Sequence, residues 1–494
     1  MRLIDLIDGT SARMSGPMVD GEQPVAALTE DSRAVTPGAL FAALPGTRTH
    51  GRAFIGDAIK RGAVAVLARD GSALPADAES AVLITSPRPR RAFSQMAARF
   101  HPRQPAVVAG VTGTNGKTSV AAFARQIWAA AGHNAVSLGT LGLVPPVVAA
   151  PGGLTTPDPV SLHHCLDALA GTGVDHLAVE LSSHGLDQER VDGLALTAAA
   201  FTNLSQDHLD YHGDMERYFR AKARLFAELL PPGGTAVINA DTPQSGALME
   251  ICRQRGHALW TYGGDGDATL RLDSRTADPT GQDLTITAFD RTTQVRLPLV
   301  GQFQAMNALA ALGLAVAGGT ELGTALAALA QLEGAPGRLQ RVAGTAQGAA
   351  VFVDYAHTPE ALATVLDALR PHARARLIAV IGAGGDRDRG KRPEMGRIAA
   401  ERADHVIVTD DNPRTEDPAS IRRAILDGAT GAAEIGDRAA AIRAAVTGLG
   451  GGDVVLIAGK GHETGQIVGE TTLPFDDTET ARAAVAEQEA GQTP

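Results

Sequence analysis

The chain has 494 residues, which at roughly 100–200 residues per domain is enough for two to four domains. Its 44 lysines and arginines stand against 55 aspartates and glutamates, a net charge of −11, and 44% of its residues are hydrophobic. This composition excludes a wholly disordered chain and argues against a nucleic-acid-binding protein, because binding to a phosphate backbone requires a basic surface.

The cysteines and the apolar segments indicate the cellular compartment. Cys165 and Cys252 are too few for a disulfide framework, and the start MRLIDLID places Asp5 and Asp8 where a signal peptide needs an apolar run. The longest apolar segment, Ala305 to Gly319, falls short of the roughly 18 residues that suggest a membrane span. We therefore expect a soluble, cytoplasmic protein without membrane insertion.

The first part of the chain, up to about residue 100, predicts a small α/β module. It has a turn-rich stretch from Pro37 to Gly51 and a strand from Ala63 to Ala68. A different pattern begins at Ala106, where AVVAGV predicts a buried strand, GTNGKT a loop, and Ser119 to Ala131 a helix closed by a glycine.

Strands and helices continue through the middle of the chain. Leu177 to Leu181 and Ala236 to Asn239 predict two more buried strands. Leu270 to Val300, with LTITAF and VRLPLV, predicts a short β excursion before an alanine-rich helix from Met306.

Beyond Gly337 the chain alternates regularly between strands and helices. Four apolar runs, VFVDY, RLIAVIG, HVIVTD and DVVLIAG, are separated by helices, three of which carry Pro359, Pro393 or Pro418 in their first turn. This alternation predicts a parallel, doubly wound sheet, in which ligands bind at the carboxyl ends of the strands. The loops after the four runs are therefore candidate binding loops.

The string GVTGTNGKTS, Gly110 to Ser119, is typical of a loop that binds nucleotide phosphates. Its glycines let backbone N–H groups face a phosphate, Lys117 adds a positive charge, and Thr118 offers a hydroxyl to Mg²⁺. The strict pattern would place its first glycine at Val111, whereas the glycines stand at 110, 113 and 116. A chance glycine turn is the alternative, and the strand–loop–helix context favours nucleotide binding.

Acidic and histidine side chains near this loop indicate a metal site. Glu180 ends the buried strand LAVEL, and Asp207, His208, Asp210 and His212 follow in one segment. Carboxylates at strand ends bind Mg²⁺ in phosphate-loop enzymes. Solvated surface residues are the alternative reading, and zinc is possible on ligand type, but the phosphate loop favours Mg²⁺.

Lys222 falls in the middle of an apolar helix face. That face comprises Met215, Tyr218, Phe219, Leu225, Phe226 and Leu229. The lysine either extends to solvent, the commoner outcome, or is buried with its pKa lowered by desolvation. A neutral amine can react with CO₂ to give a carbamate, a carboxylate-like metal ligand.

Charged loops in the last third fit anion or zwitterion recognition. GGDRDRGKRP carries Arg387, Arg389, Lys391 and Arg392, and DDNPR adds Arg414. Arginine forks suit carboxylates, whereas a carboxylate such as Glu463 suits an ammonium group. A salt-bridged, solvated loop is the alternative, and two such loops at adjacent strand ends favour an amino-acid pocket.

Together these motifs resemble the Mur ligases of peptidoglycan synthesis, most closely members that add meso-diaminopimelate to UDP-N-acetylmuramoyl-L-alanyl-D-glutamate. The resemblance covers nearly the whole chain, through DSRAVTPGALFAALPG, GTNGKT, TTPDP, ELSSHGLDQERVDG, GAPGRLQRV, DYAHTP, DRDRGKRP, DNPR and GKGHE. It implies an α/β fold of three domains: residues 1–100 binding the UDP-substrate, a central P-loop ATPase with a parallel sheet over residues 101–336, and a Rossmann-like amino-acid-binding domain over residues 337–494.

The resemblance also implies the reaction and its participants. An ATP-dependent ligase would form an acylphosphate and then an amide, with Mg²⁺ as cofactor. The expected partners are ATP, UDP-N-acetylmuramoyl-L-alanyl-D-glutamate and meso-diaminopimelate, with no nucleic acid, and the chain is expected to be a monomer.

Site residues follow from the resemblance position by position. ATP would be bound by Gly113, Thr114, Asn115, Gly116, Lys117, Thr118, Asn307 and Arg338. The UDP-substrate would be bound by Ser32, Thr47, Arg48, Thr49, Thr155, Thr156, Ser182, Gln188 and Arg190. Diaminopimelate would be bound by Arg387, Asp411, Asn412, Pro413, Arg414, Gly459 and Glu463. The catalytic residues would be Lys117, Glu180, His208 and Lys222, and the metal ligands Thr118, Glu180, His208 and Lys222, the last as a carbamate.

Three positions depart from the family's pattern, and three alternatives stay open. Glu30 stands where leucine is usual, Gln304 replaces an asparagine, and Gly465 replaces an aromatic residue. A lysine-adding Mur ligase is disfavoured by DNPR, and a folylpolyglutamate synthetase by the N-terminal DSR module. A P-loop nucleotide switch is disfavoured by the residues expected to bind metal and by the second ligand-binding sheet.

Overall fold

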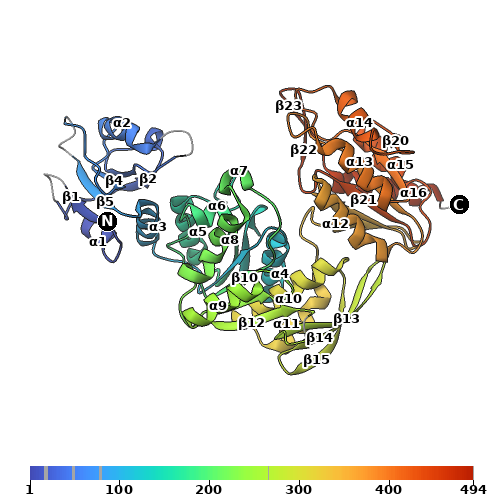
Figure 1. The fold of residues 1–494 in the computed structure, drawn as a ribbon, viewed down its shortest axis with the longest axis horizontal. Helices are drawn as coiled ribbons and strands as arrows, with labels where there is room; N and C mark the ends of the chain where they lie inside the picture. Colours follow the sequence, from blue (N-terminus) through green and yellow to red (C-terminus); the bar gives the residue numbers. More distant parts are fainter. Residues whose placement is uncertain (16–19, 47–49, 77–80, 265, 493–494) are drawn as a thin grey trace. The chain divides into compact units, whose positions relative to one another are not determined.

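The computed structural model describes residues 1–15, 20–46, 50–76, 81–264 and 266–492. They form two compact units. The first comprises Met1–Lys117, Gly132–Ile238 and Thr242–Leu259, and the second comprises Thr118–Ala131, Asn239–Asp241 and the chain from Trp260 onward. Both units are built from β-sheets flanked by helices, which confirms the predicted α/β class (Figure 1).

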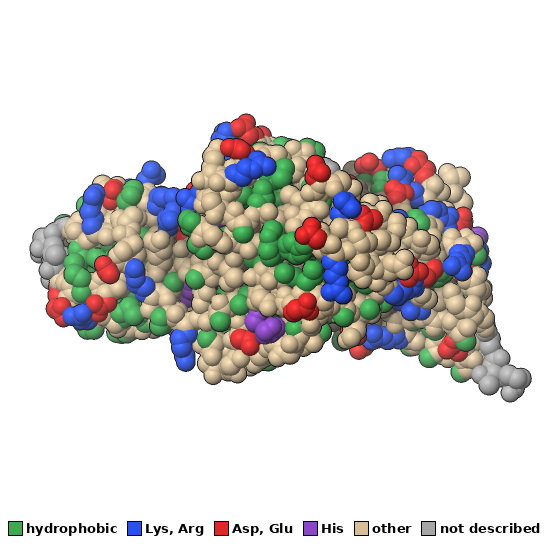
Figure 2. All heavy atoms as spheres, turned by 90° about the horizontal axis from the view of Figure 1, so that it is seen from below, with side chains coloured by type: hydrophobic (Ala, Val, Ile, Leu, Met, Phe, Trp, Pro, Cys, Tyr) green, Lys and Arg blue, Asp and Glu red, His purple; other side chains and the backbone are tan. Residues whose placement is uncertain are grey.

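The surface and the helices bear on solvent and membrane contact. On the face shown in Figure 2, Lys and Arg side chains are interspersed with Asp and Glu, so charges of both signs are spread over it. No helix within the described ranges is long and apolar enough to cross a membrane.

The N-terminal part of the first unit is a five-stranded sheet in the order β1-β5-β4-β3-β2. All its neighbouring pairs are parallel except β1 with β5. Helices α1 and α3 pack on one face, and α2 packs on the other. The elements are α1 (Leu3–Ile7), β1 (Arg13–Ser15), β2 (Ala27–Thr29), η1 (Ser32–Ala34), β3 (Ala39–Ala42), η2 (Gly51–Phe54), α2 (Ile55–Lys60), β4 (Ala65–Arg69), β5 (Val82–Ser86) and α3 (Pro89–Phe100). This sheet is the small α/β module expected from the sequence.

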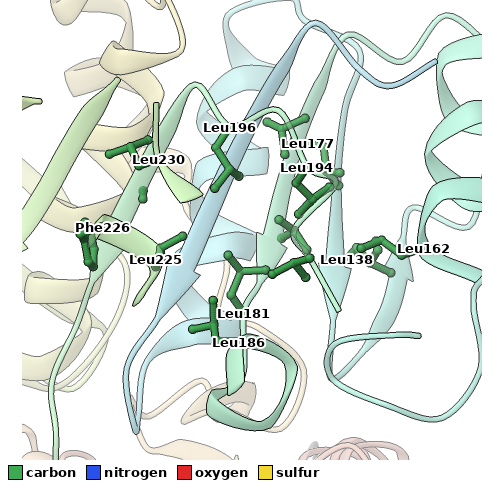
Figure 3. Close-up of a cluster of buried hydrophobic side chains, with 14 of the residues drawn as sticks. Leu138, Leu162, Leu177, Leu181, Leu186, Leu194, Leu196, Leu225, Phe226 and Leu230 are labelled. Carbon is green, nitrogen blue, oxygen red and sulfur yellow. The ribbon is translucent and has the colours of Figure 1, made fainter. Parts of the chain in front are cut away.

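The central sheet of the first unit has the order β11-β10-β6-β9-β7-β8, parallel except for β8. Leucines from strands and helices form its core on one face, as Figure 3 shows for Leu177, Leu181 and Leu186. The elements are β6 (Val107–Thr112), β7 (Ala135–Gly139), β8 (Gly142–Val144), α5 (Pro159–Gly171), β9 (His176–Glu180), α6 (Ser183–Asp187), β10 (Ala198–Phe201), α7 (Leu209–His212), α8 (Met215–Arg224), the π-helical turn η3 (Leu225–Leu229), β11 (Thr235–Asn239) and α9 (Ser245–Arg255). The apolar face that begins on α8 continues through a π-helical turn. The segment is therefore not the single regular helix that the spacing of its apolar residues predicts.

The second unit begins with helices and an antiparallel meander. Trp128 of α4 donates from its indole nitrogen to the carbonyl oxygen of Ala315 in α10, at 3.3 Å. Strands β13, β14 and β15 form the β excursion expected before the alanine-rich helix, which begins at Gln302 rather than Met306. The elements are α4 (Lys117–Ala130), β12 (Ala258–Gly263), β13 (Leu270–Asp278), β14 (Gly281–Ala288), β15 (Arg291–Leu297), α10 (Gln302–Ala317), α11 (Leu322–Ala328) and η4 (Leu329–Gln331).

The C-terminal sheet is doubly wound, as predicted, in the order β16-β17-β21-β18-β19-β20. Only β16 runs antiparallel. Alternate strand residues face opposite sides, so α12, α13 and α14 cover one face and α15 and α16 the other (Figure 1). The elements are β16 (Gln340–Gly344), β17 (Ala350–Asp354), α12 (Pro359–Leu369), η5 (Arg370–His372), β18 (Leu377–Ile381), α13 (Lys391–Arg402), β19 (His405–Val408), α14 (Pro418–Leu426), β20 (Ala433–Glu434), α15 (Arg438–Val446), β21 (Val454–Ala458), the hairpin β22 (Gly465–Val468) with β23 (Thr471–Pro474), and α16 (Asp477–Gln492).

Candidate active site

The carboxyl ends of β6, β9 and β10 meet at one edge of the central sheet. In the parallel register, Val111 pairs with Glu180, and Thr112 pairs with Phe201. The Thr112 hydroxyl also donates to the carbonyl oxygen of Leu181, at 2.8 Å. The phosphate loop and the segments that follow β9 and β10 therefore begin side by side, as expected for a ligand site in a parallel sheet.

The phosphate loop lies between β6 and α4, and its glycines are required by its geometry. Gly113 has φ +148°, and a Cβ there would lie 1.8 Å from the hydroxyl oxygen of Thr202. The segment after β10 holds the loop: Asn203 accepts from the backbone N–H of Thr114 at 2.9 Å, and Thr202 donates to the carbonyl oxygen of Asn115 at 2.6 Å. The loop is thus fixed against a neighbouring strand end.

Lys117 is the first residue of α4 and closes over the phosphate loop. Its Nζ donates to the carbonyl oxygens of Gly113 and Thr114, at 2.9 and 2.8 Å. Thr118 follows it in the first turn of the helix. A cation and a helix N-terminus adjoin the glycine loop, which is the arrangement that binds phosphate.

Lys222 of α8 is buried, with 1% of its surface exposed. Its Nζ donates to the carbonyl oxygen of Gly113 at 2.7 Å and lies 4.6 Å from the ring centroid of Tyr218. Burial lowers the pKa of Lys222 well below its usual range, and nearby Lys117 lowers it further. Of the two outcomes predicted for Lys222, extension to solvent or burial, the structure shows burial.

Glu180 ends β9 with 2% of its surface exposed. Thr140 holds the Glu180 carboxylate. The backbone N–H of Thr140 donates to Glu180 Oε1 at 2.9 Å, and the Thr140 hydroxyl donates to Glu180 Oε2 at 3.2 Å. A Cβ on Gly139 would lie 2.1 Å from Oε1, so a side chain there would displace the carboxylate. The result is a rigidly held hard oxygen donor, the kind that Mg²⁺ prefers.

His208 lies in the segment after β10, on the loop side of the sheet. It is half-exposed and has φ +52°, a left-handed conformation that is uncommon for residues other than glycine. Its ring lies 4.8 Å from that of His184. Asp207 and Asp210 of the same segment are exposed, whereas His212 is buried and burial lowers its pKa. Glu180 is thus buried and hydrogen-bonded, whereas His208, Asp207 and Asp210 are exposed.

Five of the residues expected to bind the UDP-substrate form one hydrogen-bonded network. Thr156 donates to the carbonyl oxygen of Glu180 and accepts from the backbone N–H of Ser182, at 3.0 and 2.9 Å. Arg190 donates to the carbonyl oxygen of Thr156 at 2.7 Å and to the side chain of Gln188 at 2.6 Å. The Thr155 hydroxyl lies 3.1 Å from that of Thr140, which also contacts Glu180. This network links the predicted substrate residues to the predicted metal carboxylate.

Of the other predicted UDP-substrate residues, the structure describes Ser32. Ser32 begins the short helix η1, whose preceding residue, Asp31, accepts from the backbone N–H of Arg33. Thr47, Arg48 and Thr49 lie outside the described residues.

In the second unit, the predicted ATP contacts Asn307 and Arg338 are joined by Gln304. The Asn307 side chain donates to Gln304 Oε1 at 2.9 Å, and Gln304 Nε2 donates to the carbonyl oxygen of Arg338 at 3.1 Å. The Arg338 guanidinium lies 4.8 Å from the ring centroid of Tyr355. Gln304, which departs from the family's asparagine, therefore links the two predicted ATP contacts by hydrogen bonds.

The predicted amino-acid site is built around a buried lysine, Lys460. Its Nζ donates to Asn412 Oδ1 at 2.9 Å and lies 3.3 Å from Glu463 Oε2. The Asn412 amide donates to the same Glu463 oxygen at 2.8 Å. Burial raises the pKa of the neighbouring Asp411, whose carboxylate packs against Gly459. The loops DNPR and GKGHE are thus locked together at adjacent strand ends.

Two arginines of this region differ in accessibility. Arg414 is half-buried, and its Nη1 donates to the carbonyl oxygen of Gly385 at 2.9 Å. Arg387 is exposed on the loop after β18. A third arginine, Arg438, is fully buried and forms a two-bond ion pair with Asp477, at 2.7 Å for each bond.

Comparison with known proteins decides the family. Three protein-family models match this chain: "Mur ligase family, catalytic domain" over residues 24–101, "Mur ligase middle domain" over 111–315, and "Mur ligase, glutamate ligase domain" over 337–461. A UDP-N-acetylmuramoyl-L-alanyl-D-glutamate--2,6-diaminopimelate ligase of Bradyrhizobium diazoefficiens is 53% identical, covering 98% of this chain and 99% of the relative. The chain belongs to the Mur ligase family. A relative of the same name from Caulobacter vibrioides is 53% identical over 93% of this chain and 95% of its own.

Solved Mur ligases share the architecture. A structure described as a UDP-N-acetylmuramoyl-L-alanyl-D-glutamate--2,6-diaminopimelate ligase superimposes with TM-score 0.75 at 32% identity, covering 99% of both chains. Folylpolyglutamate synthase of Mycobacterium tuberculosis, solved with ADP, reaches TM-score 0.59 at 20% identity over 82% of this chain and 95% of its own, and so shares the fold alone. The three-domain Mur ligase fold predicted from the sequence is confirmed, whereas the boundaries at residues 100 and 336 stay predictions.

Within this Mur ligase, part of the predicted anion cluster is a structural ion-pair network. Arg392 is buried, and two of its guanidinium nitrogens donate to Glu416, at 2.9 and 3.1 Å. Arg389 also pairs with Glu416, at 3.3 Å, and the ion pairs and hydrogen bonds of Glu416 lower its pKa to about 2. The salt-bridge alternative therefore describes these two arginines, while Arg387 and Arg414 stand outside that pairing.

Several residues that shape this Mur ligase site were not predicted as site residues, and Tyr218 was expected only as part of the apolar helix face. Tyr218 lies against Lys222 and its hydroxyl is 3.1 Å from that of Thr114, and burial raises its pKa to about 12. Thr140 orients Glu180, and Lys460 orients Asn412 and Glu463. Two of them carry a sequence signal: Tyr218 stands on the apolar helix face of Lys222, and Lys460 directly follows the apolar run DVVLIAG, where a buried lysine requires a partner.

Proposed function

We propose that this chain is the ATP-dependent ligase that joins meso-2,6-diaminopimelate to UDP-N-acetylmuramoyl-L-alanyl-D-glutamate, in peptidoglycan precursor synthesis. The observation that carries this proposal is the near-full-length identity of 49–53% to relatives named for this ligation. Lys117 supplies the chemical support, because it places a cation at the carbonyl oxygen of Gly113 in the phosphate loop, where a phosphoryl-transferring site requires positive charge.

The proposed reaction has two steps. A carboxylate oxygen of the D-glutamate side chain attacks the γ-phosphorus of ATP, the bond to the β,γ-bridging oxygen breaks, and ADP leaves. The free amine of diaminopimelate then attacks the acyl carbon, loses its proton, and displaces inorganic phosphate as the amide forms. Lys117 offsets the charge on the transferring phosphoryl group, and the glycine loop positions the phosphates.

Mg²⁺ is the proposed cofactor, with Glu180, His208 and the hydroxyl of Thr118 as the residues that would hold it. The buried, Thr140-bound carboxylate of Glu180 fits a hard cation. When bound, the ion would neutralise charge on the phosphate oxygens.

Lys222 is proposed to act as a carbamate. Burial lowers the pKa of its amine and so favours the neutral form, and a neutral amine adds to CO₂ with loss of one proton. The carbamate nitrogen retains one hydrogen, so the bond to the carbonyl oxygen of Gly113 can persist. The modified side chain would then present a carboxylate beside the phosphate loop.

Substrate selection is proposed to divide between the first unit, which would hold the UDP-substrate, and the C-terminal sheet, which would hold diaminopimelate. The network of Thr155, Thr156, Ser182, Gln188 and Arg190, together with Ser32 and Thr47, Arg48 and Thr49, would hold the UDP-substrate. Asn307 and Arg338 would contact ATP. Arg387, Asp411, Asn412, Pro413, Arg414, Gly459 and Glu463 would form the diaminopimelate site, where an arginine fork suits the distal carboxylate and Glu463 suits an ammonium group.

Release of ADP tests this function in a reconstituted reaction with ATP and Mg²⁺. We expect ADP to form only when UDP-N-acetylmuramoyl-L-alanyl-D-glutamate and meso-diaminopimelate are both present, with a product heavier by one diaminopimelate less one water. ADP release without either acceptor would indicate a nucleotide switch, and release that requires a folate and glutamate would indicate a folylpolyglutamate synthetase. Either result would overturn the proposal.

A further inference from the structure

Two histidines and an aspartate meet at the end of the central sheet opposite the phosphate loop. His133 lies two residues before β7, Asp175 directly precedes β9, and His176 is the first residue of β9. One ligand atom from each side chain lies within 4.8 Å of the others. Among the described residues, this is the one set of three histidine, cysteine or acidic side chains grouped so closely.

The backbone holds these three residues in place. Ala135 and His176 are partners in the parallel register of β7 and β9. The backbone N–H of Asp175 donates to the carbonyl oxygen of Asn134 at 3.0 Å, and the Asn134 side chain donates to the carbonyl oxygen of Gly173, also at 3.0 Å. Both segments are thus tied to each other at the start of adjacent strands, so the ligand set belongs to the rigid part of the fold.

The side chains leave the cluster partly open to solvent. His176 is 5% exposed, whereas His133 and Asp175 are half-buried. The His133 and His176 rings lie 4.0 Å apart, and His176 Nδ1 is 2.7 Å from Asp175 Oδ1. Two imidazoles and a carboxylate beside solvent form a three-residue donor set with room for a water ligand.

We propose that His133, Asp175 and His176 bind a zinc-class divalent ion, such as Zn²⁺, Co²⁺ or Ni²⁺. Imidazole nitrogen suits these ions, whereas Mg²⁺ prefers oxygen ligands. Four steps along β9 separate His176 from Glu180, about 13 Å at 3.3 Å per residue. The site is therefore distinct from the phosphate-binding edge, and it does not depend on the proposed ligase function.

An ordinary aspartate–histidine pair is the competing explanation, and the chain has the same two residue types at the start of another strand. Asp404 and His405 stand at the start of β19 as Asp175 and His176 stand at the start of β9. The Asp404 carboxylate, however, accepts from Arg370 at 2.9 Å and from the backbone N–H of Leu377 at 2.7 Å. Both donors bind the same oxygen, Asp404 Oδ2, and His405 is exposed. His405→Ala is therefore the natural control.

A calorimetric titration of the full chain with Zn²⁺ tests the proposal. Excess Mg²⁺ is present to occupy oxygen-rich sites. We expect one Zn²⁺ equivalent in the unaltered chain and in His405→Ala, and at least about 10-fold weaker binding in His133→Ala and in Asp175→Asn. Zinc should also raise the melting temperature of the unaltered chain, and less so that of the two site variants. His133→Gln provides a second variant if His133→Ala folds poorly.

A spectroscopic measurement locates the ion independently of affinity. With Co²⁺ in place of Zn²⁺, we expect visible absorption bands of nitrogen-ligated cobalt that His133→Ala removes. Anomalous scattering at the zinc edge should peak between His133 and His176. Equal Zn²⁺ binding by the unaltered chain and the site variants, or an anomalous peak elsewhere, would overturn the proposal.

Discussion

Lys117 and Lys222 donate to the same atom, the carbonyl oxygen of Gly113, at 2.9 and 2.7 Å. Two ammonium groups so close repel each other, and Lys222 is the buried member of the pair. The neutral amine that a carbamate requires is therefore favoured at Lys222, while Lys117 lies less buried at the start of α4, beside the phosphate loop.

Replacing Lys222 by alanine should lower kcat by about 10²–10³-fold, the range seen when one group that stabilises a transition state is lost. ATP affinity should change much less, because the glycine loop and Lys117 remain. Steady-state kinetics and nucleotide titration measure the two effects. Lys60→Ala, at an exposed helix end, is the matched control and should behave as the unaltered chain does.

The carbamate itself makes a separate prediction. Activity of the unaltered chain should fall in CO₂-depleted buffer and return when bicarbonate is added. The residual activity of Lys222→Ala should not respond. An unaltered chain that is indifferent to CO₂, with mass spectrometry showing no mass increase on Lys222, would remove the carbamate from the mechanism.

Replacing Lys460 by methionine should raise KM for diaminopimelate. Lys460 orients Asn412 and Glu463 by hydrogen bonds to charged and amide oxygens, and such bonds contribute about 1.5–3 kcal/mol each. We expect an increase of about 10–100-fold in KM for the amino acid and little change in KM for ATP, measured by initial rates. Equal increases for all three substrates would show a general loss of structure instead.

Replacing Arg414 by alanine should weaken selection of the distal carboxylate. We expect kcat/KM for meso-diaminopimelate to fall by about 100-fold, in line with the loss of a charged hydrogen-bonding pair. Arg389→Ala removes an arginine that is paired with Glu416 and 75% exposed, so its effect should be within about 2-fold. If the two variants are equally impaired, Arg414 has no special role in recognition.

His163 should make stability depend on pH. Burial lowers its pKa to about 4, whereas an unfolded histidine titrates near 6.5. The unfolded chain therefore binds more protons between these values, so stability is unaffected above pH 6.5 and falls as the pH drops toward 4. The loss from this group is about 2 kcal/mol at pH 5 and about 3 kcal/mol at pH 4.

Thermal melting of the unaltered chain and of His163→Gln between pH 7 and pH 4.5 checks this. The variant should lose less stability over that range, because it lacks the buried group that must be protonated. His405→Gln, at an exposed position, should follow the unaltered chain. Parallel pH curves for His163→Gln and the unaltered chain would contradict the account.

Periodicity and loop chemistry predicted the sheets and the phosphate loop because these depend on local pattern. The atypical glycine spacing has a structural reason: Val111 is a buried residue of β6, and the close approach that demands glycine occurs two residues later, at Gly113, against Thr202. Thr202 follows a different strand, so no local pattern could indicate that contact.

Side-chain orientation was less predictable. Whether Lys222 extends to solvent or lies buried depends on Tyr218 and on the loop after β6, which come together only in the folded chain. The pairing of Arg392 with Glu416 likewise joins residues 24 positions apart. Segments rich in charged residues show where charged side chains are concentrated. Tertiary packing decides which of these side chains form ion pairs with one another.

The ratio of kcat/KM for meso-diaminopimelate to that for L-lysine tests the central claim most directly. It is measured with the unaltered chain, ATP, Mg²⁺ and UDP-N-acetylmuramoyl-L-alanyl-D-glutamate. A site built to bind a second carboxylate should reject an analogue that lacks it, so we predict a ratio of at least about 10³. A ratio near 1, or one that favours lysine, would contradict the account.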